Sequence, residues 1–296
     1  MPRKIKHIIK LLRPKHYIKN LLLFVSITFN QSLLDISVLA RVLCGFIAFC
    51  SISSAIYIFN DIHDVEQDRQ HEVKKNRPIA SGAISVKLAY IIAFGLFITA
   101  LAINLLCGFS WQAMAIMLVY FVCNLGYSLG LKNIPFLDIV LLVMGFMLRV
   151  LYGAAIIGSG VSAWVYLTVI SLSFYLGLGK RRNELKKSKG ETSTRKVLSF
   201  YSFEFLDKFM YLCLTLAVAF YALWSADAEI VVKYGTDKLI WTVPLVIVLL
   251  MKYSADIESN SYGDPVDVIT HDKVLVLLSF VFALVLFGLI YIPGLR

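Results

Sequence analysis

Long apolar blocks, each close to the length of a membrane span, recur along the 296 residues of this chain. A helix needs about 20 apolar residues to cross the hydrocarbon core of a bilayer. Only helices or a closed barrel can satisfy backbone hydrogen bonds there, and the blocks lack the alternation of barrel strands. With 59% of its residues hydrophobic and 16% charged, the chain is more apolar than a soluble domain. We predict an all-α, polytopic membrane helical bundle of about nine transmembrane helices, near residues 20–34, 38–59, 88–107, 111–129, 136–157, 163–179, 209–226, 239–254 and 274–293.

The basic residues gather on one side of this nine-span arrangement. The exceptions among the 29 Lys and Arg are Arg41, Lys233, Lys238, Arg296 and the intramembrane Arg149. The others lie in the N-terminal segment or near the four loops of residues 60–87, 130–135, 180–208 and 255–273. The positive-inside rule places this side, with the N-terminus, in the cytoplasm. The net charge of +10 is then explained by topology and anionic membrane lipids, and no nucleic-acid partner is expected.

We expect a single integral membrane domain over residues 1–296, of which residues 1–19 form a basic interfacial segment. Its first 19 residues are basic and interrupted by Ile5, Ile8, Ile9 and Leu12, which share one helical side. This pattern favours an amphipathic helix lying in the membrane interface. A basic tail that only sets the topology is the alternative.

An acidic cluster follows the second apolar block. The run is Asn60-Asp61-Ile62-His63-Asp64-Val65-Glu66-Gln67-Asp68. In a helix Asn60, Asp61, Asp64 and Asp68 fall within an arc of about 100°. Three carboxylates on one face repel one another unless a cation lies among them, and oxygen-only ligands suit Mg²⁺. We predict a Mg²⁺ site made by these four residues, with the three aspartates as catalytic residues; a solvated charged loop is the alternative.

Basic residues suited to phosphate follow this cluster and recur after the sixth block. Lys74 and Arg77 come just beyond the acidic run. Lys180, Arg181 and Glu184 lie in Lys180-Arg181-Arg182-Asn183-Glu184-Leu185. Guanidinium and ammonium groups bind phosphate oxygens, so both runs are candidate substrate-binding sites. For the second run, a positive stop signal for membrane insertion is the alternative.

Arg149 lies deep in the fifth apolar block. A charged side chain inside the membrane is costly and implies a partner or a cavity. We expect it to bind an anionic substrate, with a pair to an intramembrane acid as the alternative. Further substrate-binding candidates at the cytoplasmic ends of the blocks are Lys19, Asn20, Tyr127, Lys132 and Asp264.

The acidic run and its flank resemble a known family. Asn60-Asp61-x-x-Asp64-x-x-x-Asp68, followed by Lys74 and Arg77-Pro78, resembles the first motif of the UbiA-type intramembrane prenyltransferases. That resemblance implies nine helices with cytoplasmic loops over a central cavity. Most members carry a second Asp-rich motif between the sixth and seventh spans, where this chain has Lys180-Arg181-Arg182-Asn183-Glu184-Leu185.

This departure is typical of one branch, the polyprenyl-phosphate phosphoribosyltransferases of the decaprenyl-phosphate kind. Other runs also resemble that branch: Arg13-Pro-x-x-x-x-Lys19-Asn20, Tyr127-Ser128 with Lys132, Leu148-Arg149, Gly179-Lys180-Arg181-x-x-Glu184-Leu185 and Gly263-Asp264-Pro265-x-Asp267. The resemblance implies a Mg²⁺-dependent transferase of cell-wall biosynthesis in a bacterial inner membrane. Its donor would be phosphoribosyl diphosphate and its acceptor a polyprenyl phosphate.

Two alternatives stay open at this point. An ordinary UbiA-type enzyme would move a prenyl group from a prenyl diphosphate to an aromatic acceptor, and the basic run at 180–182 argues against it. A membrane transporter would need charged residues along a path through the bilayer. Here most charges gather at one face, and turns such as 107–110 and 158–162 carry none.

Overall fold

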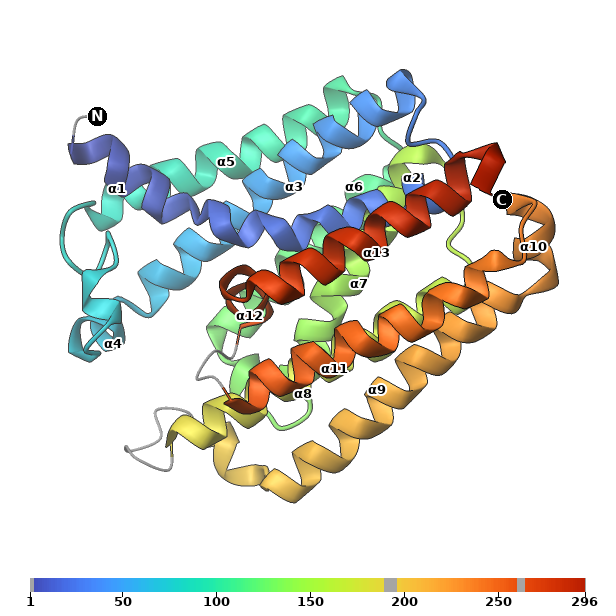
Figure 1. Ribbon diagram of the computed structural model, residues 1–296. Helices are drawn as coiled ribbons and strands as arrows, with labels where there is room; N and C mark the ends of the chain where they lie inside the picture. Colours follow the sequence, from blue (N-terminus) through green and yellow to red (C-terminus); the bar gives the residue numbers. More distant parts are fainter. Residues whose placement is uncertain (1–2, 189–195, 260–263, 296) are drawn as a thin grey trace. The chain divides into compact units, whose positions relative to one another are not determined.

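The computed structural model describes residues 3–188, 196–259 and 264–295. All regular elements in these ranges are helical, so the predicted all-α class is confirmed (Figure 1). Eight helical stretches are long and apolar enough to cross a membrane. They are α3 (Ile36–His63), α5 (Val86–Leu106), α6 (Trp111–Leu129), α7 (Leu137–Ile157), α8 (Ala163–Ser188, of which 163–187 qualify), α9 (Phe203–Ala226), η5 with α11 (Lys238–Thr242 and Val243–Ser259) and α13 (Lys273–Tyr291).

The ninth predicted span, residues 20–34, has a different form. Its sequence belongs to a 3₁₀ helix, η1 (Pro14–Leu23), which runs into the short α2 (Phe24–Phe29). The run then ends at Asn30 and Gln31, where Gln31 has a positive φ of 55°. The count of nine is therefore not confirmed, and the cytoplasmic location of the N-terminus stays a prediction.

The chain forms two compact units, Met1–Gly160 and Val161–Arg296. Single-domain organisation stays a prediction. In the first unit, α3 and α7 are the most buried spans, whereas α5 and α6 expose large apolar side chains such as Ile91, Phe94 and Val122. Exposed apolar side chains on a membrane span are covered by lipid. Buried serines, alanines and glycines on α3 and α7 let neighbouring backbones approach closely.

Small residues bring η1 directly against α7. A Cβ atom added at Gly153 would lie 2.1 Å from the backbone oxygen of Leu23. Leu23 itself is fully buried in a core that includes Phe49, Tyr120 and Tyr152. The segment that carries Lys19 and Asn20 is thereby fixed on the inner spans.

Polar residues define where the spans begin. Asp35 accepts hydrogen bonds from the backbone amides of Ser37 and Val38 at the start of α3. Ser85 and Ser110 make the equivalent bonds for α5 and α6. Such N-caps satisfy amides that have no partner within the helix.

The N-terminal residues form α1 (Arg3–Leu12), as the amphipathic pattern predicted. The helix buries Leu11 completely against Ile58, Ile62 and residues of α5, while Ile5 and Ile9 are exposed. Its buried side is thus offset from the predicted one. Its position in the membrane interface stays a prediction.

Short elements complete the first unit: α4 (Val65–Gln70), η2 (Lys74–Asn76) and η3 (Leu131–Asn133).

In the second unit, α8 packs along α9, and α11 packs against α13 (Figure 1). Tyr175 of α8 shares a hydrogen bond of 2.6 Å with Ser254 of α11. Lys252 of α11 pairs with Asp256 and, at 2.5 Å, with Asp272 at the N-terminus of α13. The remaining short elements are η4 (Lys196–Phe200), α10 (Ala228–Tyr234), α12 (Pro265–His271) and η6 (Pro293–Leu295).

Candidate active site

The acidic run is carried beyond the apolar part of α3. This helix has 28 residues and is therefore about 42 Å long, longer than the hydrocarbon core of about 30 Å. Its last turn brings Asn60 and Asp61 past the apolar stretch. The chain stays close to helical through Asp64, because the Asp64 amide bonds to the Asn60 oxygen and the Asp68 amide to the Asp64 oxygen.

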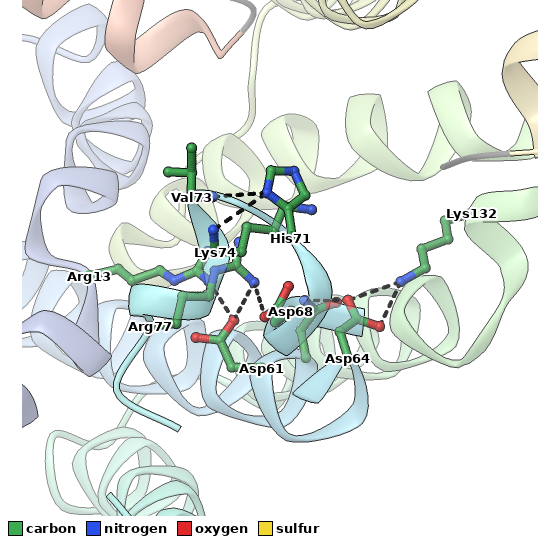
Figure 2. Close-up of polar contacts among 10 residues, drawn as sticks. Arg13, Asp61, Asp64, Asp68, His71, Val73, Lys74, Arg77 and Lys132 are labelled. Carbon is green, nitrogen blue, oxygen red and sulfur yellow. Dashed lines mark hydrogen bonds and ion pairs between the residues drawn. The ribbon is translucent and has the colours of Figure 1, made fainter. Parts of the chain in front are cut away.

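Two arginines converge on Asp61 and Asp68. Arg77 Nη1 lies 2.9 Å from Asp61 Oδ1 and 2.7 Å from Asp68 Oδ2 (Figure 2). Arg13 Nη2 lies 2.5 Å from the same Asp61 oxygen. Both carboxylates are 2% exposed, so these ion pairs are largely shielded from solvent. The backbone of Arg13 is left-handed, with φ 55°, and its guanidinium stacks 5.2 Å from the ring centre of Tyr57.

Asp64 faces a different base. Lys132 Nζ lies 3.2 Å from both of its oxygens, and the side-chain amide of Asn60 donates to Asp64 Oδ2 at 3.1 Å (Figure 2). Lys132 is presented by η3, directly after Gly130, whose φ of 138° turns the chain at the end of α6. The four predicted metal ligands therefore divide into two groups, one around Arg77 and one around Lys132.

The donor set fits a divalent cation that would replace a basic partner. Among the residues that the structure describes, no group of three His, Cys, Asp or Glu side chains is assembled to hold a metal ion. Asp61 and Asp68 nevertheless direct one oxygen each toward the same nitrogen atom of Arg77. Converging carboxylate oxygens on one helical run are the ligands that Mg²⁺ prefers.

Arg149 is held by neutral groups. Its Nε donates to Asn20 Oδ1 and its Nη2 to the Tyr120 hydroxyl, each at 2.8 Å, and its Nη1 donates to the Gly145 oxygen. The guanidinium also lies over the rings of Phe49 and Tyr120. The side chain is buried, and within the described ranges no carboxylate forms an ion pair with it. Its positive charge is thus solvated by dipoles and π-faces rather than neutralised.

The basic run after the sixth block forms the last turns of α8. Arg181 is fully buried, and its Nη1 donates to Glu184 Oε2 at 2.6 Å. Lys180 lies 3.9 Å from Asp264, which also accepts from the Val266 amide and so begins α12. Gly263, the first residue of the run Gly263-Asp264-Pro265-x-Asp267, lies outside the described residues.

Three other predicted residues lie on the first unit. Lys19 is half-buried in η1, Tyr127 is half-buried near the end of α6, and Lys74 is exposed at the start of η2. In sum, the structure brings Asn20 to Arg149, Lys132 to Asp64, and Arg77 to Asp61 and Asp68.

Comparison with known proteins identifies the fold and the family. The model of the UbiA prenyltransferase family matches residues 23–264, most of the chain. The chain belongs to the UbiA prenyltransferase family. The predicted resemblance is confirmed, and the chain is a transferase of the membrane, which sets aside the transporter alternative.

Two curated relatives in this family are similar over nearly the whole chain. Decaprenyl-phosphate phosphoribosyltransferase of Corynebacterium glutamicum is 33% identical over 96% of this chain and 86% of its own length. The protein of the same name from Mycolicibacterium smegmatis is 32% identical over 92% of this chain and 88% of its own length. Among solved structures, a UbiA homologue from Archaeoglobus fulgidus bound to GPP and Mg²⁺ has a TM-score of 0.71. It is 19% identical and covers 97% of this chain and 100% of its own, a likeness that shows the fold.

Two residues of this UbiA-family site escaped the sequence prediction. Arg13 was noted in a motif but not assigned to the site, because nothing local links it to Asp61, 48 residues later. Tyr120 lies within an apolar block, where the sequence indicates only a packing role for a tyrosine. Its partner Arg149, a charge inside a span, was the only signal that a polar neighbour was needed.

Proposed function

We propose that this protein transfers 5-phosphoribose from phosphoribosyl diphosphate to a polyprenyl phosphate, with Mg²⁺, releasing diphosphate. The observation that carries the proposal is the similarity, over nearly the full chain, to proteins named decaprenyl-phosphate phosphoribosyltransferase. The basic run at 180–182, in place of a second Asp-rich motif, supports the same choice.

The acidic cluster is the proposed place of the leaving group. Asp61, Asp64 and Asp68, with Asn60, would hold Mg²⁺, which when bound supplies positive charge to the departing diphosphate. Lys74 and Arg77 follow these acids in the sequence and Lys132 contacts Asp64, so these three bases would hold phosphate oxygens. Arg77 and Lys132, which now pair with aspartates, could exchange these partners for the phosphates of the donor.

The reaction breaks the bond between ribose C1 and a diphosphate oxygen and forms a bond from C1 to an oxygen of the acceptor phosphate. The acceptor phosphate is already an anion, so no side chain has to remove a proton from it. The chain's contribution is then positioning and charge stabilisation, which is the main source of catalysis in transfers of this kind.

Arg149 is the proposed contact for the acceptor phosphate. It carries a buried charge that is not neutralised by any carboxylate in the described ranges, and an anionic group would complete it. Lys19, Asn20 and Tyr127 are proposed to assist on the same unit. On the second unit, the proposed substrate contacts are Lys180, Arg181, Glu184 and Asp264.

The proposed location is a bacterial inner membrane with the acidic cluster on the cytoplasmic side, as the distribution of Lys and Arg suggests. A cysteine in place of the exposed Glu66 would react with an impermeant maleimide in inverted vesicles and not in intact cells. Labelling of intact cells would reverse the orientation.

The transfer is tested with purified protein in detergent, MgCl₂, a short polyprenyl phosphate and radiolabelled phosphoribosyl diphosphate. We expect label in the butanol-extractable lipid, and its loss with EDTA. Asp68→Asn should lower the rate by about 100-fold or more, because a ligand carboxylate contributes several kcal/mol to charge stabilisation.

Glu66→Gln is the matched control. It lies on the same short helix, but its side chain is 74% exposed and, among the described residues, pairs only with Arg69, so activity should stay near that of the wild type. No lipid label, together with transfer from a prenyl diphosphate to an aromatic acid, would replace this proposal with ordinary prenyl transfer.

A further inference from the structure

The Arg77 Nη1 atom lies between two carboxylates that would hold Mg²⁺. Arg77 Nη1 is within 2.9 Å of an oxygen from each of two carboxylates, Asp61 and Asp68. Asp61 and Asp68 would hold Mg²⁺ through carboxylate oxygens, the ligands that this ion prefers. A guanidinium nitrogen and a metal ion cannot share this position, so one excludes the other.

We propose that Arg77 is a placeholder cation: it neutralises Asp61 and Asp68 until Mg²⁺ displaces it, and the released guanidinium then binds the phosphates of the donor. This inference rests on the Mg²⁺ role in the proposed function. If the proposal is right, Mg²⁺ binding and the binding of Arg77 to the donor phosphates are coupled.

The charge balance favours this exchange. Asp61, Asp68, Arg13 and Arg77 together carry no net charge. If Mg²⁺ joined them while Arg77 stayed, two uncompensated positive charges would remain beside carboxylates that are 2% exposed. Uncompensated charge in a poorly solvated place is strongly unfavourable. If Arg77 leaves toward an anionic donor, one positive charge remains among Mg²⁺, Asp61, Asp68 and Arg13, and the donor phosphates compensate both that charge and Arg77.

The two arginines on Asp61 are not equivalent. The two side chains are similarly exposed, 25% for Arg77 and 21% for Arg13, so exposure does not separate them, but Arg77 follows only the three-residue η2. Arg13 stacks on Tyr57 and follows α1, which is buried through Leu11. Arg13 therefore keeps Asp61 in place as a positioning residue, while Arg77 is the one that moves.

The exchange is tested by Mn²⁺ binding to the purified protein in detergent, followed by electron paramagnetic resonance, without donor or acceptor. Mn²⁺ has the same oxygen preference as Mg²⁺. In Arg77→Gln the competing cation is gone, so Mn²⁺ affinity should rise about ten-fold, the effect of removing a charge-assisted contact. Affinity of the Mn²⁺-loaded variant for inorganic diphosphate should fall by a similar factor.

Opposite changes in the two affinities are the signature of a placeholder. If Arg77 only held the carboxylates in position, both affinities would fall together, and that result would overturn the inference. Arg77→Lys keeps a competing charge and should bind Mn²⁺ close to the wild-type affinity. Arg69→Gln removes a nearby arginine that pairs with the exposed Glu66, and both affinities should stay unchanged.

Failure of the exchange and failure of the proposed function give different results. Mn²⁺ binding that is lost in Asp61→Asn but not strengthened in Arg77→Gln rejects the placeholder and leaves the metal site standing. No Mn²⁺ binding to wild type or Arg77→Gln, even with inorganic diphosphate, rejects the metal site itself and the placeholder with it.

Discussion

The close approach of η1 to α7 at Gly153 allows a stringent test of how the site is supported. A Cβ atom there would lie 2.1 Å from the Leu23 oxygen and 2.9 Å from its carbonyl carbon. Non-bonded heavy atoms prefer separations of about 3.5 Å or more. In Gly153→Ala the backbone of Leu23 must therefore move away from α7 by more than about 1 Å.

This displacement reaches the site through η1. Asn20 lies three residues before Leu23 on the same 3₁₀ helix and accepts from Arg149 at 2.8 Å. A shift of about 1 Å takes that contact beyond hydrogen-bond range. Overpacking costs about 1–3 kcal/mol of stability, and a misplacement of about 1 Å can cost about 100-fold in rate. We expect a lower Tm in detergent and phosphoribosyl transfer reduced about 10- to 100-fold.

Gly95→Ala is the matched control. Gly95 lies in α5, and an added Cβ atom meets nothing within 4 Å there. Alanine favours helix over glycine by about 1 kcal/mol, so this variant should be as active as the wild type and no less stable. If Gly153→Ala also kept the wild-type Tm and rate, η1 would not be packed on α7 as described, and its role in placing Asn20 would be refuted.

Three further predictions concern single polar residues. Arg149→Lys keeps the charge but not the three-way donation, so the KM for polyprenyl phosphate should rise about ten-fold or more while the KM for phosphoribosyl diphosphate stays unchanged; equal rises would contradict an acceptor role. Asp35→Ala removes the N-cap of α3 and should lower the Tm, with activity per folded molecule retained. Hydrogen bonds from Lys252 and from the Leu275 amide hold the pKa of Asp272 below its usual value. The stabilisation that these bonds provide is present above the unfolded pKa of about 3.9 and is lost as the pH falls through the lower folded pKa. The Tm difference between wild type and Asp272→Asn should therefore be largest at pH 6 and become smaller below about pH 4.

The spans were predictable because bilayer length and apolarity dictate them, and eight of the nine predicted blocks became long helices. Residues 20–34 do not form one long helix, although their apolar run resembles a span. Pro14 opens a 3₁₀ helix instead, and Gln31 ends the run with a positive φ, neither of which hydropathy reports.

The candidate site was predictable only in part. Helical periodicity correctly gathered the acids, since i to i+4 bonds continue from Asn60 through Asp64 to Asp68. It could not divide them, because the division depends on bases that arrive through the tertiary fold. Lys132 reaches Asp64 across 68 residues of sequence, a relation that no local pattern contains.

The N-terminal helix has a practical consequence for handling the protein. α1 packs through Leu11 onto the α3–α5 core, Lys10 bonds to the Asn76 oxygen, and Arg13 contacts Asp61. Affinity tags or reporter proteins fused ahead of α1 would disturb a segment that contacts the acidic cluster through Arg13. Limited proteolysis that removes residues before Pro14 would take one of the two arginines from Asp61. If the acidic cluster holds Mg²⁺ as proposed, preparations that lack residues 1–13 should differ in metal affinity from those that keep Arg13, and comparisons between laboratories need the same N-terminus.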